Sequence, residues 1–239
     1  MMEKVKELVS KLLKGDNSGH GMEHINRVLN LSLKFAKEEK ADLNIVALSA
    51  LLHDVDDYKL VGRKKARDLT NAKKIMEIAK IEKDIQKKVL KIIRTMGYNK
   101  LLKGIRPDII EGKIVSDADM CDALGSNGIL RSYAFSLKNN RLFFDKDIWP
   151  IEDISYDDYV KRVADTSVCH MFEKILTLKD LMLTESGYKE ALKRHNIVVD
   201  FLRNLFEEEE ALDWLDYLNN YLLKEKNNVE LKSKFPFEC

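Results

Sequence analysis

The chain has 239 residues, with 41 Lys and Arg residues against 40 Asp and Glu residues and a formal net charge of +1 at pH 7. This balance lacks the basic excess of a nucleic-acid-binding domain, so we expect no nucleic-acid partner. Apolar runs fall short of the roughly 18 residues that a membrane span needs, so we expect no membrane segment. The three cysteines are odd in number and widely spaced, which favours a reducing compartment and a cytoplasmic protein.

Helical periodicity dominates the sequence. Only three prolines and ten glycines interrupt it, and alternating strand patterns are scarce. Asp42 is the predicted N-cap of the helix that leads to His53. Apolar residues at three- and four-residue spacing predict helices over Val28–Phe35, Ile45–Leu52, Ile75–Ile85, Val89–Ile93, Phe172–Leu183 and Ile197–Leu205. The predicted fold is therefore all-α with no substantial sheet.

The chain is long enough to bury one sizeable core, and no linker or repeat divides it. We therefore predict a single helical domain over residues 1–225. The sequence turns polar after Leu223, so residues 226–239 are predicted to form a frayed tail. The least helical stretch, about residues 139–155, and its flank contain four aromatic residues, Phe143, Phe144, Trp149 and Tyr156. Core packing is the prediction for them, and stacking on a nucleobase is the alternative.

Three short frames contain the candidate metal ligands. His24 lies in the segment 20–28, His53 and Asp54 are adjacent in the segment 51–59, and Asp119 lies in the segment 117–125. Two imidazole nitrogens and two carboxylate oxygens suit a borderline divalent cation, and they leave coordination positions open for water and substrate. On a helix, His53 and Asp54 project about 100° apart. Asp57 is predicted to share their face, because it follows them by four and three residues.

The three frames, in this order, resemble those of the HD superfamily of metal-dependent phosphohydrolases. The resemblance implies an HD-type helical bundle in which His24, His53, Asp54 and Asp119 hold a divalent ion. Manganese is our first choice, with Mg, Co, Ni, Fe or Zn as alternatives. Relatives with two metals place extra histidines between the doublet and the last aspartate, and none occurs here. One ion per chain is therefore expected.

Further segments resemble one bacterial and archaeal branch of this superfamily. They are the glycine-rich segment Gly125–Arg131, the segment His170–Asp180 and the carboxy-terminal segment Ala191–His195, followed by Phe201 and Leu202. The resemblance covers about residues 18 to 217. Some members of the branch hydrolyse nucleoside triphosphates to the monophosphate and pyrophosphate. The resemblance therefore implies a small phosphorylated substrate of the nucleotide class as the partner. The expected assembly is a monomer or a homodimer.

Asp57 and Lys59 are the candidate catalytic residues. A carboxylate beside an activated water can accept its proton, which is the role predicted for Asp57. Negative charge that develops on phosphate requires fixed cations, and Lys59 is the first candidate because it closes the doublet frame. Arg27, Arg131 and Lys174 are further candidates for this role. For each of these basic residues the alternative is a surface or helix-pairing role.

Two more histidines are candidate substrate contacts. His170 either touches phosphate or anchors helices through a hydrogen bond. His20 is predicted to face substrate or water, although Gly21 stands where the family commonly has aspartate. Asp117 and Asp122 flank Asp119, and the resemblance implies that they orient ligands or neighbouring helices.

The sequence thus predicts a metal-dependent phosphohydrolase that uses activated water on a nucleotide or a related small phosphate ester. Within the enzyme class, 5′-nucleotidase activity and alarmone hydrolysis are alternatives. The alternative from another class is a catalytically inactive regulatory HD module that binds a metal or a nucleotide.

Overall fold

The computed structural model describes residues 1–15, 21–151 and 166–234, apart from the side chains of Lys59 and of residues 225–234. These residues are helical and contain no strand, which confirms the all-α prediction. The first half of the chain contains α1 (Met2–Leu12), α2 (Met22–Glu38), α3 (Leu43–Leu52), α4 (Tyr58–Val61), α5 (Arg63–Asp68), α6 (Thr70–Ile78), α7 (Lys83–Thr95), α8 (Tyr98–Leu101) and α9 (Ile110–Asp122). The second half contains α10 (Gly125–Lys138), α12 (Ser167–His170), η1 (Met171–Ile175), η2 (Leu176–Leu181), α13 (Glu185–Glu208) and α14 (Leu212–Lys234).

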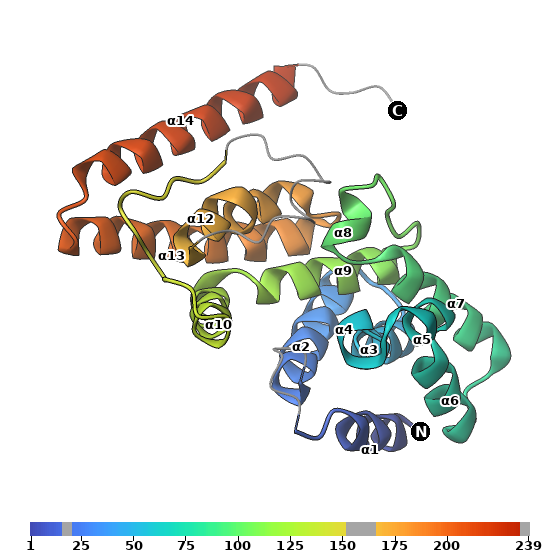
Figure 1. Cartoon of the computed structure of the whole chain (residues 1–239). Helices are drawn as coiled ribbons and strands as arrows, with labels where there is room; N and C mark the ends of the chain where they lie inside the picture. Colours follow the sequence, from blue (N-terminus) through green and yellow to red (C-terminus); the bar gives the residue numbers. More distant parts are fainter. Residues whose placement is uncertain (16–20, 152–165, 235–239) are drawn as a thin grey trace.

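Helix α3 is the centre of the amino-terminal bundle. Its sequence contains no charged residue, and every residue from Ile45 to Leu52 is buried. A helix that is apolar on all sides must be covered on all sides. The covering helices are α1, α2, α7 and α9, which pack around α3 (Figure 1). The predicted cap is confirmed, because the side chain of Asp42 accepts hydrogen bonds from the backbone N–H groups of Asn44 and Ile45.

The carboxy-terminal half is built on the long helix α13, which packs against α9, α10, η2 and α14. Aromatic side chains fill the space between α13 and α14. Phe144 contacts Phe206 and Trp214, and Trp149 stacks on Trp214 with ring centroids 4.2 Å apart. Phe143 contacts Phe201 of α13 in the same region. Phe143 and Phe144 pack against the core, as the core-packing interpretation predicts, whereas Trp149 stays 41% exposed and Tyr156 lies outside the described residues.

The last helix continues further than the polar composition after Leu223 indicates. Helix α14 ends at Lys234, within the stretch predicted as a frayed tail. Lys, Glu and Leu residues, which have favourable helix propensities, dominate this stretch, so a polar composition does not by itself end a helix. Among the described residues, no helix is long and apolar enough to cross a membrane.

Candidate metal centre

Three helices bring the four predicted ligands together. His24 lies in the first turn of α2, His53 and Asp54 follow the last residue of α3, and Asp119 lies in the last turn of α9. Because α2, α3 and α9 pack against one another, their ends meet at one place although the residues are up to 95 positions apart in the chain. The bundle core therefore positions the site.

The ligand atoms lie within contact distance of one another. Nε2 of His24 is 3.1 Å from Nε2 of His53, 3.3 Å from Oδ2 of Asp54 and 3.4 Å from Oδ1 of Asp119. Nε2 of His53 is 3.4 Å from Oδ2 of Asp54 and 3.7 Å from Oδ1 of Asp119. Two ligand atoms that are each about 2.1 Å from one ion are about 3.0–3.5 Å apart at octahedral or tetrahedral angles. Ligand atoms of His24, His53 and Asp119 all lie within 4.8 Å of one another, as one divalent ion requires, and Oδ2 of Asp54 lies against both histidines.

Each histidine is held from behind by a hydrogen bond. Nδ1 of His24 is 2.7 Å from Oδ2 of Asp122, and Nδ1 of His53 is 2.8 Å from the carbonyl oxygen of Ala50. Both partners are acceptors, so each Nδ1 carries a proton, and Nε2 is the nitrogen left to present a lone pair to a metal ion. This is the tautomer that a metal-ligating histidine needs.

The site favours a positive charge at its centre. Burial by itself lowers the pKa of His24, but hydrogen bonds to Asp119, Asp122 and Asp54 outweigh it and raise the pKa to about 11. Burial raises the pKa of Asp119, but the neighbouring His24 and His53 outweigh it and hold the pKa below its ordinary value. The carboxylates therefore stabilise a cation, either a proton on His24 or a metal ion.

Solvent reaches the cluster from its carboxylate side. The His24 and His53 side chains are only 3% and 2% exposed, whereas those of Asp54 and Asp119 are 15% and 27% exposed. The cluster is therefore most open to solvent on the side of the two aspartates.

The structure corrects the prediction that the doublet and Asp57 share one helical face. Helix α3 ends at Leu52, and residues 53–56 form turns before α4 begins. The cause lies in Asp56, whose buried carboxylate accepts hydrogen bonds from the N–H groups of Asn71 and Ala72 in α6 and ties the turn to that helix. Asp57 is half-buried, and its carbonyl oxygen accepts hydrogen bonds at the start of α4. It therefore follows the doublet on a turn.

Two predicted cations meet at Asp122, directly behind His24. Arg27 donates from Nε and a terminal nitrogen to the two carboxylate oxygens, at 2.6 and 3.0 Å. Arg131 donates to Oδ2 at 2.8 Å. With His24, these contacts outweigh the effect of burial and hold the pKa of Asp122 well below its ordinary value. Both arginines remain about one-third exposed, at 34% and 31%.

The glycine-rich segment explains how Arg131 reaches this position. Gly125 has φ +67, and a Cβ at Gly128 would lie 2.1 Å from the carbonyl oxygen of Ala123. Only glycine permits so close an approach at position 128. Helix α10 therefore turns tightly away from the end of α9, and its second turn brings Arg131 back to Asp122.

The other predicted substrate contacts lie elsewhere or outside the described part. Lys174 lies over the ring of Tyr98 of α8, with Nζ 4.5 Å from the centroid. Burial, reinforced by Lys174, lowers the pKa of the half-buried His170 to about 3, so its ring is neutral near pH 7 and supplies no positive charge to a phosphate. The side chain of Lys59 and the whole of His20 lie outside the described residues.

Asp117 and Asp122 differ in role although both flank Asp119. The buried carboxylate of Asp117 accepts hydrogen bonds from the N–H groups of Leu183 and Thr184 and from the Thr184 hydroxyl. It thus joins α9 to the start of α13. Asp122 instead contacts the ligand His24. Sequence reasoning missed Asp56 and the Ala50 carbonyl group, because nothing in the local pattern indicates their distant partners.

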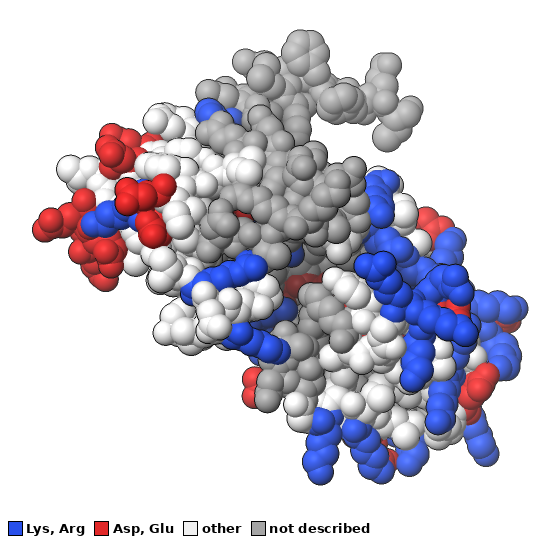
Figure 2. All heavy atoms as spheres, viewed as in Figure 1, with Lys and Arg blue, Asp and Glu red and all other residues white. Residues whose placement is uncertain are grey.

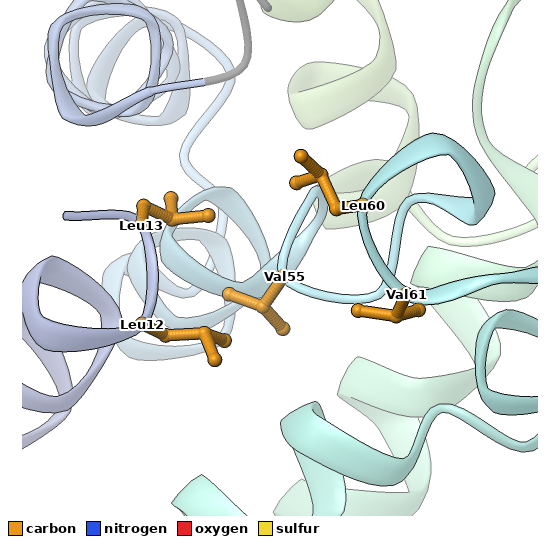
Figure 3. A pocket seen from close by; sticks show the side chains of 5 residues that line it. All are labelled: Leu12, Leu13, Val55, Leu60 and Val61. Atoms are coloured by element: carbon orange, nitrogen blue, oxygen red, sulfur yellow. The ribbon is translucent and has the colours of Figure 1, made fainter. Parts of the chain in front are cut away.

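A small apolar cavity of about 160 Å³ lies behind the doublet. Side chains from α1, the turn after α3 and α4 line it, as Figure 3 shows. They are Leu12, Leu13, Val55, Leu60 and Val61. An aliphatic lining offers no group that would bind phosphate or a metal, so this cavity is separate from the chemistry of the ligand cluster.

Comparison with known proteins agrees with this geometry. Residues 21–124 match the HD domain family. The chain is 32% identical to the uncharacterised protein YpgQ of Bacillus subtilis over 217 residues, which cover 88% of this chain and 95% of YpgQ. A crystal structure of YpgQ in complex with ADP aligns with a TM-score of 0.67 at 29% identity, covering 87% of this chain and 97% of that one.

Two further crystal structures are similar over the same extent. A Lactobacillus plantarum protein aligns with a TM-score of 0.74 at 30% identity, and an HD-superfamily hydrolase of Bacillus thuringiensis aligns with a TM-score of 0.69 at 32% identity. Each alignment covers 88% of this chain and 97% of the other. The similarity thus includes the helices beyond the matched domain as well as the three helices that bring the ligands together. The chain belongs to the HD superfamily, as a single-domain protein similar to YpgQ.

Proposed function

We propose that this protein is a metal-dependent phosphohydrolase that cleaves a nucleotide or a related small phosphate ester with an activated water. The observation that carries the proposal is the close packing of four ligand atoms, with both histidines held in the ligating tautomer. Membership of a superfamily that includes a hydrolase supports the reaction class. The ADP complex of YpgQ supports a nucleotide as the substrate class.

The proposed metal set is His24, His53, Asp54 and Asp119, with manganese as the first choice. A bound divalent ion supplies a water activated near neutral pH and polarises a phosphoryl oxygen. The exposed sides of Asp54 and Asp119 leave room for both groups. The described ligand set accounts for one ion, in line with the single site that we propose.

The roles of the chain's own groups follow from charge and position. Asp57, on the turn after the doublet, would accept a proton from the attacking water. Arg27 and Arg131, fixed by Asp122 and partly exposed, would bind phosphate oxygens as charge develops. Lys59, the second residue of α4, would add a further cation.

Lys174, His170 and His20 are proposed to act at the outer part of the substrate site. Lys174 packs on Tyr98 and would contact the distal part of a nucleotide. His170 is neutral near pH 7, which leaves it a hydrogen-bonding role. Cleavage of a nucleoside triphosphate to the monophosphate and pyrophosphate is the specific reaction that we propose to test first.

The test is turnover of a nucleotide panel by the purified full chain in Mn²⁺. Mono-, di- and triphosphates are compared, and phosphate and pyrophosphate release are scored separately. We expect release that a chelator abolishes and that Asp54→Asn, a change in one ligand, also abolishes. His195→Gln, a change at a buried histidine outside the cluster, is the matched control and should remain active. A parent protein that binds one ion but turns over none of the panel would favour the inactive regulatory module instead.

A further inference from the structure

Charge is segregated in the fold although the chain as a whole is nearly neutral. Residues 63–113, from α5 to the first turn of α9, contain 16 Lys and Arg residues against six Asp and Glu residues. The rest of the chain contains 25 against 34. We call residues 63–113 the basic lobe. Fourteen of its 16 cationic residues are exposed, and Figure 2 shows Lys and Arg side chains gathered over α5–α8 on one face of the molecule.

Ion pairs within the lobe do not remove this excess. Lys87 pairs with Asp84, Lys83 with Glu77 and Arg67 with Asp68, and all these side chains are exposed. Exposed pairs of this kind contribute little and are screened by salt. With six acidic residues in all, the lobe keeps a formal charge of +10.

The lobe also carries a turn with exposed aliphatic side chains. Helix α8 ends at Leu101, and the turn that follows it passes through Gly104, which has φ +73. The Gly104 N–H donates to the carbonyl oxygen of Leu101, and the Ile105 N–H donates to that of Lys100, both at 2.9 Å. These two bonds form a Schellman motif, which fixes the backbone of the turn. Leu102 and Ile105 nevertheless remain 38% and 40% exposed.

Cations and aliphatic residues alternate along this turn. Lys100, Lys103 and Arg106 are all exposed, and each is next or nearly next to Leu102 or Ile105 in the chain. We call residues 100–106 the basic turn. The turn therefore presents aliphatic groups and positive charges together on a fixed backbone.

The combination of positive charges and aliphatic side chains allows a choice between two polyanionic partners, a nucleic acid and an anionic bilayer. A nucleic acid offers phosphates and base faces, and proteins that bind single strands use aromatic side chains to stack on the bases. The basic turn carries aliphatic side chains instead. An anionic bilayer offers acidic headgroups for lysine and arginine and an interface into which aliphatic side chains can insert. Of these two polyanions, only the bilayer matches both the positive charges and the aliphatic side chains of the turn.

We propose that the basic lobe docks this protein on the surface of an anionic lipid bilayer. Leu102 and Ile105 enter the interface, and Lys100, Lys103 and Arg106 contact the headgroups. The more distant cations of α5–α7 add long-range attraction that weakens with salt. This proposal is independent of the proposed catalytic function. It departs from the expectation of no membrane partner, which rested on the absence of an apolar run long enough to span a bilayer.

Sedimentation of the full chain with lipid vesicles tests the proposal. Vesicles of equal parts phosphatidylglycerol and phosphatidylcholine are compared with vesicles of phosphatidylcholine alone. We expect at least tenfold tighter binding to the anionic vesicles at low salt, and loss of most of that binding in about 0.5 M salt. Equal binding to both kinds of vesicle, or binding to neither, would overturn the proposal.

Two variants separate the charge from the aliphatic contribution. Lys100→Glu/Lys103→Glu/Arg106→Glu should weaken anionic-vesicle binding at least tenfold, and Leu102→Ser/Ile105→Ser should weaken it about fivefold. The control for the charge variant is Lys138→Glu/Lys193→Glu/Lys224→Glu, which makes the same charge change on α10, α13 and α14. The control for the aliphatic variant is Leu212→Ser, at a residue of α14 that is 70% exposed. The controls should bind as the parent does.

Folding and the alternative partner are checked in the same series. All substituted side chains are exposed, so melting temperature and phosphate release should match the parent. A single-stranded RNA of about 20 nucleotides is the competing probe in a filter-binding assay. One contrary result is that the parent binds the RNA but not the vesicles, and that the basic-turn charge variant loses the RNA binding. That result would assign the lobe to nucleic acid and reject the bilayer. The proposal would also be rejected if the control variants lost as much vesicle binding as the basic-turn variants.

Discussion

His24 and Asp122 are joined by a hydrogen bond of 2.7 Å between Nδ1 and Oδ2, so a buried carboxylate behind the site orients one of the predicted ligands. The same carboxylate accepts hydrogen bonds from Arg27 and Arg131. One side chain therefore positions both a metal ligand and the two arginines proposed to bind phosphate. We therefore expect metal affinity and substrate binding to depend on each other.

Replacing Asp122 with asparagine should weaken both functions. The variant loses the negative charge that holds three cationic or polar partners, so we expect about 10- to 100-fold lower metal affinity and activity. Metal titration and kcat/KM measure the two effects. Asp117→Asn is the matched comparison, because the Asp117 carboxylate holds Leu183 and Thr184 at the start of α13. This variant should lower the free energy of unfolding by about 1–3 kcal/mol and retain metal affinity. If Asp122→Asn binds metal as tightly as the parent, the orienting role is wrong.

His53→Ala should abolish tight metal binding. The side chain supplies one of four ligand atoms, and its loss leaves a gap that water fills poorly. Elemental analysis and titration should give about one ion per chain for the parent and none held tightly by the variant. His195→Gln should keep the ion. Two tightly bound ions in the parent would contradict the single site, and unchanged affinity in His53→Ala would contradict the ligand set.

Asp57→Asn should separate metal binding from turnover. Asp57 lies on the turn after the doublet and outside the four-atom cluster, so the ion should be retained. Loss of a general base typically costs about 10²–10⁴-fold, and kcat should fall by that factor. Asp54→Asn is the contrasting variant, since it should lose both metal and activity. Parental turnover in Asp57→Asn on the best substrate would rule out this role.

Lys59→Ala should lower kcat/KM for phosphate substrates while metal content and melting temperature stay unchanged. The residue lies on α4, two positions after Asp57, where a long cationic arm can serve the substrate site. Arginine at this position should restore activity only in part, because its planar group differs in shape from a compact ammonium. Lys64→Ala, one helix further along, is the matched control. Equal losses of activity and thermal stability in Lys59→Ala would indicate a structural role instead.

His195 should make the fold sensitive to acid. Burial, reinforced by Lys179, lowers the pKa of this α13 histidine from 6.5 to about 4. A depressed pKa means that the unfolded chain binds the proton more readily, so the contribution to stability is complete above pH 6.5 and is lost as pH falls through 4. Between pH 7 and pH 4.5, the free energy of unfolding measured in urea should fall by about 2 kcal/mol more in the parent than in His195→Gln. The same loss in both proteins would refute this assignment.

Much of the fold follows from local sequence. The apolar run Ile45–Leu52, bounded by the cap Asp42, predicts a buried helix, because hydrophobic periodicity and capping act between residues close in the chain. The four proposed ligands could also be selected from the sequence, since their residue types and order are distinctive. Whether the ion binds stays a prediction, but the chain brings ligand atoms of His24, His53 and Asp119 together and places Asp54 against both histidines.

Tertiary structure alone decided how the supporting groups are arranged. Asp122 meets His24 and Arg27 across 98 and 95 residues, and the sequence contains no signal for such a pairing. The helix ends before His53 because Asp56 binds the distant start of α6, which local periodicity cannot report. The near-neutral net charge likewise gave no sign of the basic lobe, because a net charge summed over the chain does not report where the charges lie. Local patterns determine which helices form, whereas packing determines which side chains meet.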